Sequence, residues 1–308
     1  MANRLLTTVG RARSTRPGPL RSPVVIDLAA PTVLLQWATG GLAFLWVTTR
    51  RREVGLGYGW LMRVTYGAIA GLGLWIGVSA DVVAGRELAS AGLLVTTGVA
   101  LAVSISRRGA GVSGQRAVRE WRSARVVAMT GIDRAPAVRD VDAPEFPPWL
   151  DAVPPLIGLV GLVAAGVDAG DPVALAVART VVGAAFLGAV SDAMLLGHWY
   201  LVQPGLDREP LLELVRWTGW IWPVELVVLL WPTGMWSVLD GSIDDGYNGL
   251  LGWFWVACAL TTIGLVFVTR AALRERQYSA VMAATGLLYL AILTAFGMDL
   301  VARVLLDT

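Results

Sequence analysis

The strongest constraint on this chain is a series of apolar segments that are each long enough to cross a lipid bilayer. The hydrocarbon core of a bilayer is about 30 Å thick and takes roughly 20 apolar residues per helix, and a helix satisfies its own backbone hydrogen bonds there. The segments that meet this requirement are 28–48, 57–83, 88–106, 149–167, 173–202, 211–236, 248–269 and 278–305. We therefore predict an all-α, polytopic integral membrane bundle of about eight transmembrane helices.

The composition supports a membrane protein and narrows its chemistry. Apolar residues make up 56% of the chain, charged residues 16%, and the mean hydropathy is +0.63, beyond the usual balance of a soluble domain. Cys258 is the only cysteine and His198 the only histidine, so one chain holds no disulfide, no CxxC pair and no bis-histidine haem. We expect no metal site, and at most one histidine ligand.

The arginines are unevenly distributed among the connections. They gather in three connections, at Arg50, Arg51 and Arg52, at eight positions between 107 and 148, and at Arg270, Arg274 and Arg276. If all eight segments cross, these connections lie on one side, which the positive-inside rule makes the cytoplasmic side of the plasma membrane. The opposite connections carry Asp168, Asp171, Asp240, Asp244 and Asp245.

For the N-terminus, the number of crossings and the positive-inside rule favour opposite sides of the membrane. Eight crossings place both termini outside the cytoplasm, whereas the tail 1–24 carries five arginines that favour the inside. We expect this proline-rich tail to be disordered and to contain no cleavable signal. An alternative with seven helices lets segment 28–48, which contains Pro31 and Gly40, enter and leave on the same side.

The chain thus divides into a basic tail 1–24, three transmembrane helices in 25–106, a cytoplasmic loop 107–148 and five transmembrane helices in 149–308. Apolar side chains recur at helical spacing within the loop, among arginines. This pattern predicts a basic amphipathic helix that lies on anionic lipid headgroups, with a solvated cytoplasmic helix as the alternative. The residues expected to contact the membrane surface are Arg119, Trp121, Arg122 and Arg125.

Ionisable residues inside transmembrane helices are costly, so they usually pair, face the protein interior or line a path. The short turn between segments 173–202 and 211–236 predicts an antiparallel hairpin of these two helices. Its polar side chains would then form one pocket for protons or a small cationic solute. The predicted pocket residues are Asp192, His198, Glu213, Arg216 and Glu225, with Glu213 and Arg216 close enough in sequence to pair.

Two other readings of polar residues stay open. His198 is followed by Trp199 and Tyr200, which is also typical of a helix end at the lipid headgroups. Asp299 and Arg303, four residues apart, are expected to pair locally or to extend toward the outer surface. Arg179 is expected to behave in the same way.

Tryptophan is abundant, with 14 residues. Trp149, Trp199 and Trp236 fall at predicted helix ends, where an interfacial aromatic belt places them. A denser group, Trp217, Trp220 and Trp222, lies in the first half of segment 211–236. These three side chains are candidates for the wall of a pocket that holds a flat ligand such as a quinone or a porphyrin.

Known catalytic signatures such as HExxH, GxSxG or a phosphate-binding glycine loop are absent from the sequence, so an enzyme is the least favoured class. The leading hypothesis is a bacterial-type membrane protein that binds or translocates a small solute or protons in the predicted pocket. One alternative is a non-catalytic membrane subunit or assembly factor of an electron-transfer or envelope complex. Another is a haem- or quinone-binding membrane protein that uses His198 as its single ligand. We expect no nucleic-acid partner.

Overall fold

The computed structural model describes residues 29–80, 82–114, 144–170, 172–203, 206–275 and 277–306. Throughout these ranges the secondary structure is helical, without strands. In chain order the elements are α1 (Ala30–Thr49), α2 (Leu56–Ser79), α3 (Ala84–Ser106), the short 3-10 helix η1 (Pro148–Asp151), α5 (Val153–Asp168), α6 (Val173–Val202), α7 (Glu209–Leu230), α8 (Gly234–Leu239), α9 (Leu250–Arg274) and α10 (Tyr278–Leu306).

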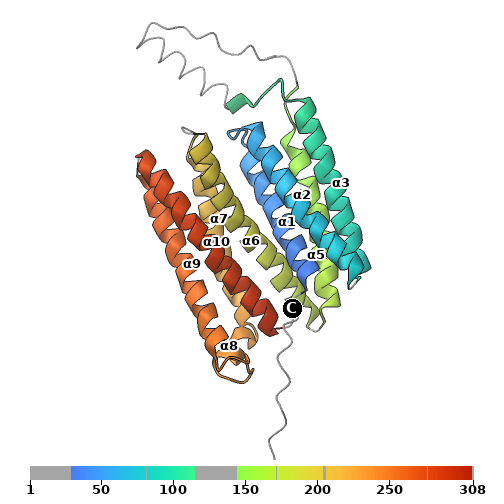
Figure 1. The fold of residues 1–308 in the computed structure, drawn as a ribbon, viewed down its shortest axis with the longest axis vertical. Coiled ribbons are helices and arrows are strands. Elements are labelled where there is room, and N and C mark those ends of the chain that lie inside the picture. The colour runs from blue at the N-terminus through green and yellow to red at the C-terminus, as the bar shows by residue number, and fades with distance from the viewer. Residues whose placement is uncertain are drawn as a thin grey trace, which may run out of the picture.

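The long helices run up and down side by side along the long axis of the molecule (Figure 1). In the described part of the chain, seven of them are long and apolar enough to cross a membrane: α1, α2, α3, α5 with η1, α6, α9 and α10. Helix α7 has 22 residues but carries more charge than these seven. The predicted all-α membrane bundle is confirmed.

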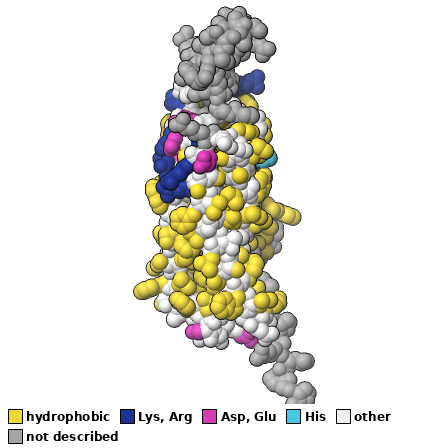
Figure 2. All heavy atoms as spheres, turned by 90° about the vertical axis from the view of Figure 1, so that its left-hand side faces the viewer, with side chains coloured by type: hydrophobic (Ala, Val, Ile, Leu, Met, Phe, Trp, Pro, Cys, Tyr) yellow, Lys and Arg dark blue, Asp and Glu magenta, His cyan; other side chains and the backbone are white. Residues whose placement is uncertain are grey.

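The bundle has a basic end and an acidic end. The basic end, at the top of Figure 1, carries Arg50, Arg51, Arg52, Arg107, Arg108 and Arg274. The acidic end carries Asp168, Asp240, Asp244 and Asp245. On the face shown in Figure 2, hydrophobic side chains cover the middle of the molecule and charged side chains lie toward its ends, as a bilayer requires.

Helix α1 is continuous over 20 residues and reaches from the acidic end to the basic end (Figure 1). The alternative in which segment 28–48 turns back within the membrane is therefore wrong. Pro31 does not break the helix because it lies in the first turn, where its missing N–H has no helical partner in any case. Which end faces the cytoplasm stays a prediction, and the tail 1–24 lies outside the described residues.

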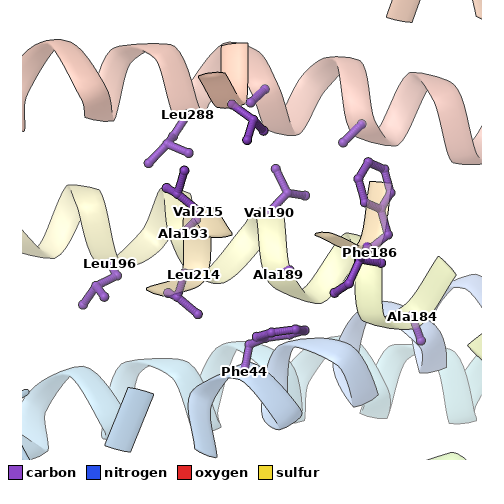
Figure 3. Close-up of a cluster of buried hydrophobic side chains, with 14 of the residues drawn as sticks. Phe44, Ala184, Phe186, Ala189, Val190, Ala193, Leu196, Leu214, Val215 and Leu288 are labelled. Carbon is purple, nitrogen blue, oxygen red and sulfur yellow. The ribbon is translucent and has the colours of Figure 1, made fainter. Parts of the chain in front are cut away.

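Helix α6 lies at the centre of the bundle and packs against α1, α5, α7 and α10. Figure 3 shows apolar side chains of α6 meeting those of three neighbouring helices. The buried residues labelled there are Phe44, Ala184, Phe186, Ala189, Val190, Ala193, Leu196, Leu214, Val215 and Leu288. Any polar side chain on α6 that points toward these neighbours is therefore buried among apolar side chains.

The backbones of α1 and α6 are in direct contact. A Cβ atom on Gly40 would lie 1.8 Å from the carbonyl oxygen of Ala184, and one on Gly188 would lie 2.2 Å from the carbonyl carbon of Gly40. Small residues at helix crossings allow this approach in membranes. The contact also lets Nε1 of Trp37 donate to Oγ of Ser191 across the interface, at 2.9 Å.

One predicted boundary is wrong. Segment 211–236 is not a single helix, because α7 ends at Leu230 and residues Gly234–Leu239 form the separate helix α8. Trp231 is extended, and Pro232 after it has no N–H with which to continue the helix. Trp236 thus lies in α8 and not at the end of a span.

The α1–α6 contact yields a stability prediction. Gly40→Ala should destabilise the protein by about 1–3 kcal/mol or more, since the new methyl group meets backbone that cannot move aside. Thermal unfolding in detergent measures the change. Gly264→Ala is the matched control, because nothing lies within 4 Å of its added Cβ. Equal melting temperatures for the two variants would contradict the packing described here.

Candidate functional site

Asp192 of α6 lies in the interior with no exposed surface. Its Oδ1 accepts a hydrogen bond from the hydroxyl of Tyr66 on α2 at 2.5 Å, and its Oδ2 has no hydrogen-bond partner among the described residues. Gly41 of α1 makes room for the tyrosine, because a Cβ there would lie 2.0 Å from Cζ of Tyr66. Three helices therefore enclose this carboxyl group.

Asp192 has no cationic partner in the described part of the chain. Within the described ranges, no arginine or histidine side chain forms an ion pair with it, and Tyr66 is its hydrogen-bond partner. An ionised carboxylate buried in this way costs several kcal/mol. The geometry thus favours a carboxyl group that carries a proton or binds a small cation.

A second tyrosine belongs to the same region. Tyr58 is fully buried, and its hydroxyl has no partner in the described part of the chain. It precedes Tyr66 by eight residues on α2, which places it about 12 Å closer to the basic end. We refer to Asp192, Tyr66 and Tyr58 as the Asp192 site.

A second polar cluster lies nearer the acidic end. It consists of Glu225 of α7 with Asp299 and Arg303 of α10, and we call it the carboxyl triad. Arg303 Nε donates to Oδ2 of Asp299 at 2.8 Å, and Nη2 donates to Oδ1 at 3.1 Å. The predicted local pairing of Asp299 with Arg303 is confirmed, but both side chains are buried and do not extend to the surface.

Glu225 and Arg179 complete the surroundings of this cluster. The carboxyl groups of Glu225 and Asp299 are near enough to act on each other electrostatically, whereas no donor group of the described chain reaches either oxygen of Glu225. Arg179 of α6 donates at 2.9 Å to the carbonyl oxygens of Val228 and of Trp231. It therefore binds the C-terminal end of α7, where a positive charge is favourable.

The structure does not bring the five predicted pocket residues together. His198 is exposed, and its Nδ1 lies 3.1 Å from the hydroxyl of Tyr289 on α10. Glu225 lies toward the acidic end, far from His198 and not at the depth of Asp192. Spacing along a helix gives depth and angle, but it does not say which helix covers each face.

The predicted pairing of Glu213 with Arg216 is wrong. Glu213 instead binds Arg50 at 2.5 Å and Arg51 at 3.1 Å, both at the end of α1. Arg216 contacts Glu209 at 3.2 Å on the exposed surface. The α1–α2 connection supplies two cations to Glu213, which the sequence of α7 alone does not reveal.

The three tryptophans proposed as a pocket wall face different neighbours. Trp217 packs edge-on against Phe44 and Trp220, with ring centroids 6.1 Å and 5.5 Å apart. Trp220 is mostly exposed, and Trp222 donates from Nε1 to the carbonyl oxygen of Ala259 on α9 at 3.1 Å. A quinone or haem at these residues or at His198 stays a prediction.

The membrane-surface residues Arg119, Trp121, Arg122 and Arg125 lie outside the described residues. In the parts of the chain that are described, no three His, Cys, Asp or Glu side chains come together as metal ligands would.

A buried ion pair near the basic end was not predicted. Arg63 of α2 binds Asp151 of η1 through two hydrogen bonds of 2.8 Å, and each side chain is 2% exposed. Beside Arg63 is a cavity of about 30 Å³, enough for a water molecule or two. The pair joins α2 to the start of α5. In the sequence, Arg63 and Asp151 are two isolated charged residues near predicted helix ends, and nothing there indicates that they pair.

The turn before α9 depends on another carboxylate, Asp245 at the acidic end. It accepts hydrogen bonds from the backbone N–H groups of Tyr247, Gly249 and Leu251 at 2.8–2.9 Å. Burial raises the pKa of Asp245, but these N–H donors outweigh it, so the pKa lies below the ordinary value of 3.8.

Comparisons with protein-family models, with curated proteins and with solved structures find no match to this chain.

The buried ion pair predicts an asymmetry between single and double substitution. Arg63→Met alone should destabilise the protein by roughly 3–5 kcal/mol because it leaves the Asp151 carboxylate buried without its cation, although the Thr49 hydroxyl still donates to Oδ2 at 2.9 Å. The double variant Arg63→Met with Asp151→Leu should recover most of that loss. Thermal unfolding in detergent compares them, and additive losses would contradict the pairing.

Asp245 predicts a local pH dependence. Because its folded pKa is lowered, its contribution is present above the ordinary pKa and is lost as the pH falls through the folded value. Hydrogen–deuterium exchange of residues 247–251 should therefore accelerate at acidic pH, after correction for intrinsic exchange rates. Asp245→Ala should show fast exchange at every pH, and an unchanged acid dependence in that variant would exclude this carboxylate as the cause.

Proposed function

We propose that the protein binds a proton at Asp192 and exchanges it with the basic end, as the proton-handling part of a membrane transport process. The observation that carries the proposal is a carboxyl group that is fully buried, accepts a hydrogen bond from Tyr66 alone, and has no cationic partner in the described chain. Ionisable groups in such positions of membrane proteins mark ion pathways and proton relays.

A proton suits this site better than a metal ion. Hard divalent cations take about six oxygen ligands, whereas the groups around Asp192 offer its own carboxyl oxygens and the Tyr66 hydroxyl. A proton on Oδ2 needs no further ligand. It removes the cost of a buried charge and leaves Oδ1 free to accept from Tyr66.

The proposed route to the basic end passes Tyr58 and Glu53. The Tyr58 hydroxyl lies between Asp192 and the basic end without a described partner, so it is free to accept and donate. Oε2 of Glu53, in the α1–α2 connection, has no hydrogen-bond partner among the described residues. Burial, with the nearby Asp207 carboxylate, raises the pKa of Glu53 above its ordinary value. A carboxyl group with a raised pKa holds a proton more readily than an ordinary glutamate, which suits it to a proton route.

Anionic lipid headgroups are the second partner that we propose. Arg50 and Arg51 are each more than a third exposed at the basic end, beside Arg107 and Arg108. Arginines next to membrane-spanning helices attract anionic headgroups, which would hold this end at the membrane surface.

Asp192→Asn should abolish proton movement while the protein stays folded. Asparagine still accepts from Tyr66 and matches the protonated carboxyl group in charge and size, but it cannot give up a proton. We expect at least a tenfold lower proton flux into proteoliposomes, followed with an enclosed pH-sensitive dye under an imposed gradient.

Asp168→Asn is the matched control, because Asp168 is exposed at the end of α5 on the acidic end, away from the proposed route to the basic end. It should behave as the wild type does. A wild-type flux equal to that of protein-free vesicles, or an unchanged flux in Asp192→Asn, would contradict the proposal.

A further inference from the structure

The carboxyl triad contains two carboxyl groups next to each other. Glu225 and Asp299 are near enough to act on each other electrostatically, and both are fully buried. Ionised carboxylates are acceptors only, so two neighbouring carboxyl groups can share a hydrogen bond only when one of them carries a proton. Adjacent carboxyl groups in a site of low dielectric constant do not both ionise readily.

The neighbouring arginines do not remove this requirement. Arg303 uses Nε and Nη2 on Asp299, and Nη2 also reaches the carbonyl oxygen of Arg179 at 3.2 Å. Arg179 is occupied by carbonyl groups at the end of α7, where the helix dipole offsets its charge. The triad itself holds two carboxyl groups and one guanidinium, so one proton makes these three groups neutral. The Arg179 charge also acts on Glu225, but its hydrogen bonds go to backbone carbonyl groups.

Buried polar atoms without partners converge at the triad. In the described chain they are both oxygens of Glu225, Nη1 of Arg303 and Oε1 of Gln36. Gly183 of α6 leaves them room, because a Cβ there would lie 2.5 Å from Nη2 of Arg303 and 2.7 Å from Oδ1 of Asp299. These unsatisfied atoms indicate a place where a proton is bound and exchanged, and they do not resemble a closed structural ion pair.

We propose that the Glu225–Asp299 pair is a second proton-binding site, which holds one exchangeable proton and lies nearer the acidic end than Asp192. Glu225 lies five residues, or about 7.5 Å, before the end of α7, and Arg179 beside it lies thirteen residues, or about 20 Å, from Asp192 along α6. This inference rests on the proposed function, because a second site at another depth turns proton binding into a translocation path. The proton is shared between the two carboxyl groups, and Arg303 holds Asp299 in place.

Infrared spectroscopy of the protein in lipid bilayers tests the two sites separately, because protonated carboxylic acids have a C=O stretching band that ionised ones lack. At neutral pH the wild type should show such absorption from both sites, shifted in D₂O. Glu225→Gln should remove the contribution of the triad alone, and Asp192→Asn that of the Asp192 site alone. The glutamine amide still donates to Asp299, so the fold should persist.

Glu225→Asp keeps an acid at this position and should retain a band, which separates loss of the proton from disturbance of the helix packing. Asp168→Asn, which removes an exposed carboxyl group at the end of α5, is the control and should leave the band of the protonated carboxyl groups unchanged. A spectrum of Glu225→Gln that equals the wild type would overturn the second site. Loss of the band in Glu225→Gln with no change in Asp192→Asn would support the triad and contradict the proposed role of Asp192.

Discussion

Lipid offers a charged side chain no partner, so each ionisable group between these helices has to be neutralised inside the protein. Arg63 is neutralised by Asp151, and Arg303 by Asp299, each through two hydrogen bonds. Asp192 differs because its described partner is a neutral hydroxyl. A proton is the simplest way to meet the same requirement there, and a proton, unlike an arginine, can leave. The function we propose follows from this difference between closed ion pairs and an open carboxyl group.

Helix α6 links the two proposed sites. It carries Asp192 toward the basic end, and toward the acidic end it presents Gly183 to the carboxyl triad. Its contact with α1 through Gly40 and Gly188 is close enough that the two backbones touch. Because α6 has α1, α5, α7 and α10 around it, both sites are shielded from lipid. A small displacement of α6 against α1 would alter both sites together, which suits a protein that moves a proton between them.

Much of this fold could be predicted from the sequence, and less of the site. The length and polarity of the apolar segments predicted the bundle, and segment 173–202 coincides with α6. Asp192 and Glu225 stood out as costly carboxyl groups, but their partners are Tyr66 on α2 and Asp299 on α10. Those contacts join residues more than 70 positions apart, and hydropathy does not say which helices are neighbours. Tyr66 carried no signal, because an amphipathic tyrosine within a span is also typical of ordinary packing.

Carbon-13 nuclear magnetic resonance of the Asp192 side-chain carboxyl group in lipid bilayers, assigned by its loss in Asp192→Asn, reports directly whether this group carries a proton. We predict the chemical shift of a protonated carboxyl group at neutral pH. We also predict a change in that shift when Tyr66→Phe removes the hydroxyl donor. A chemical shift typical of an ionised carboxylate at neutral pH, unaffected by Tyr66→Phe, would contradict the proposed function.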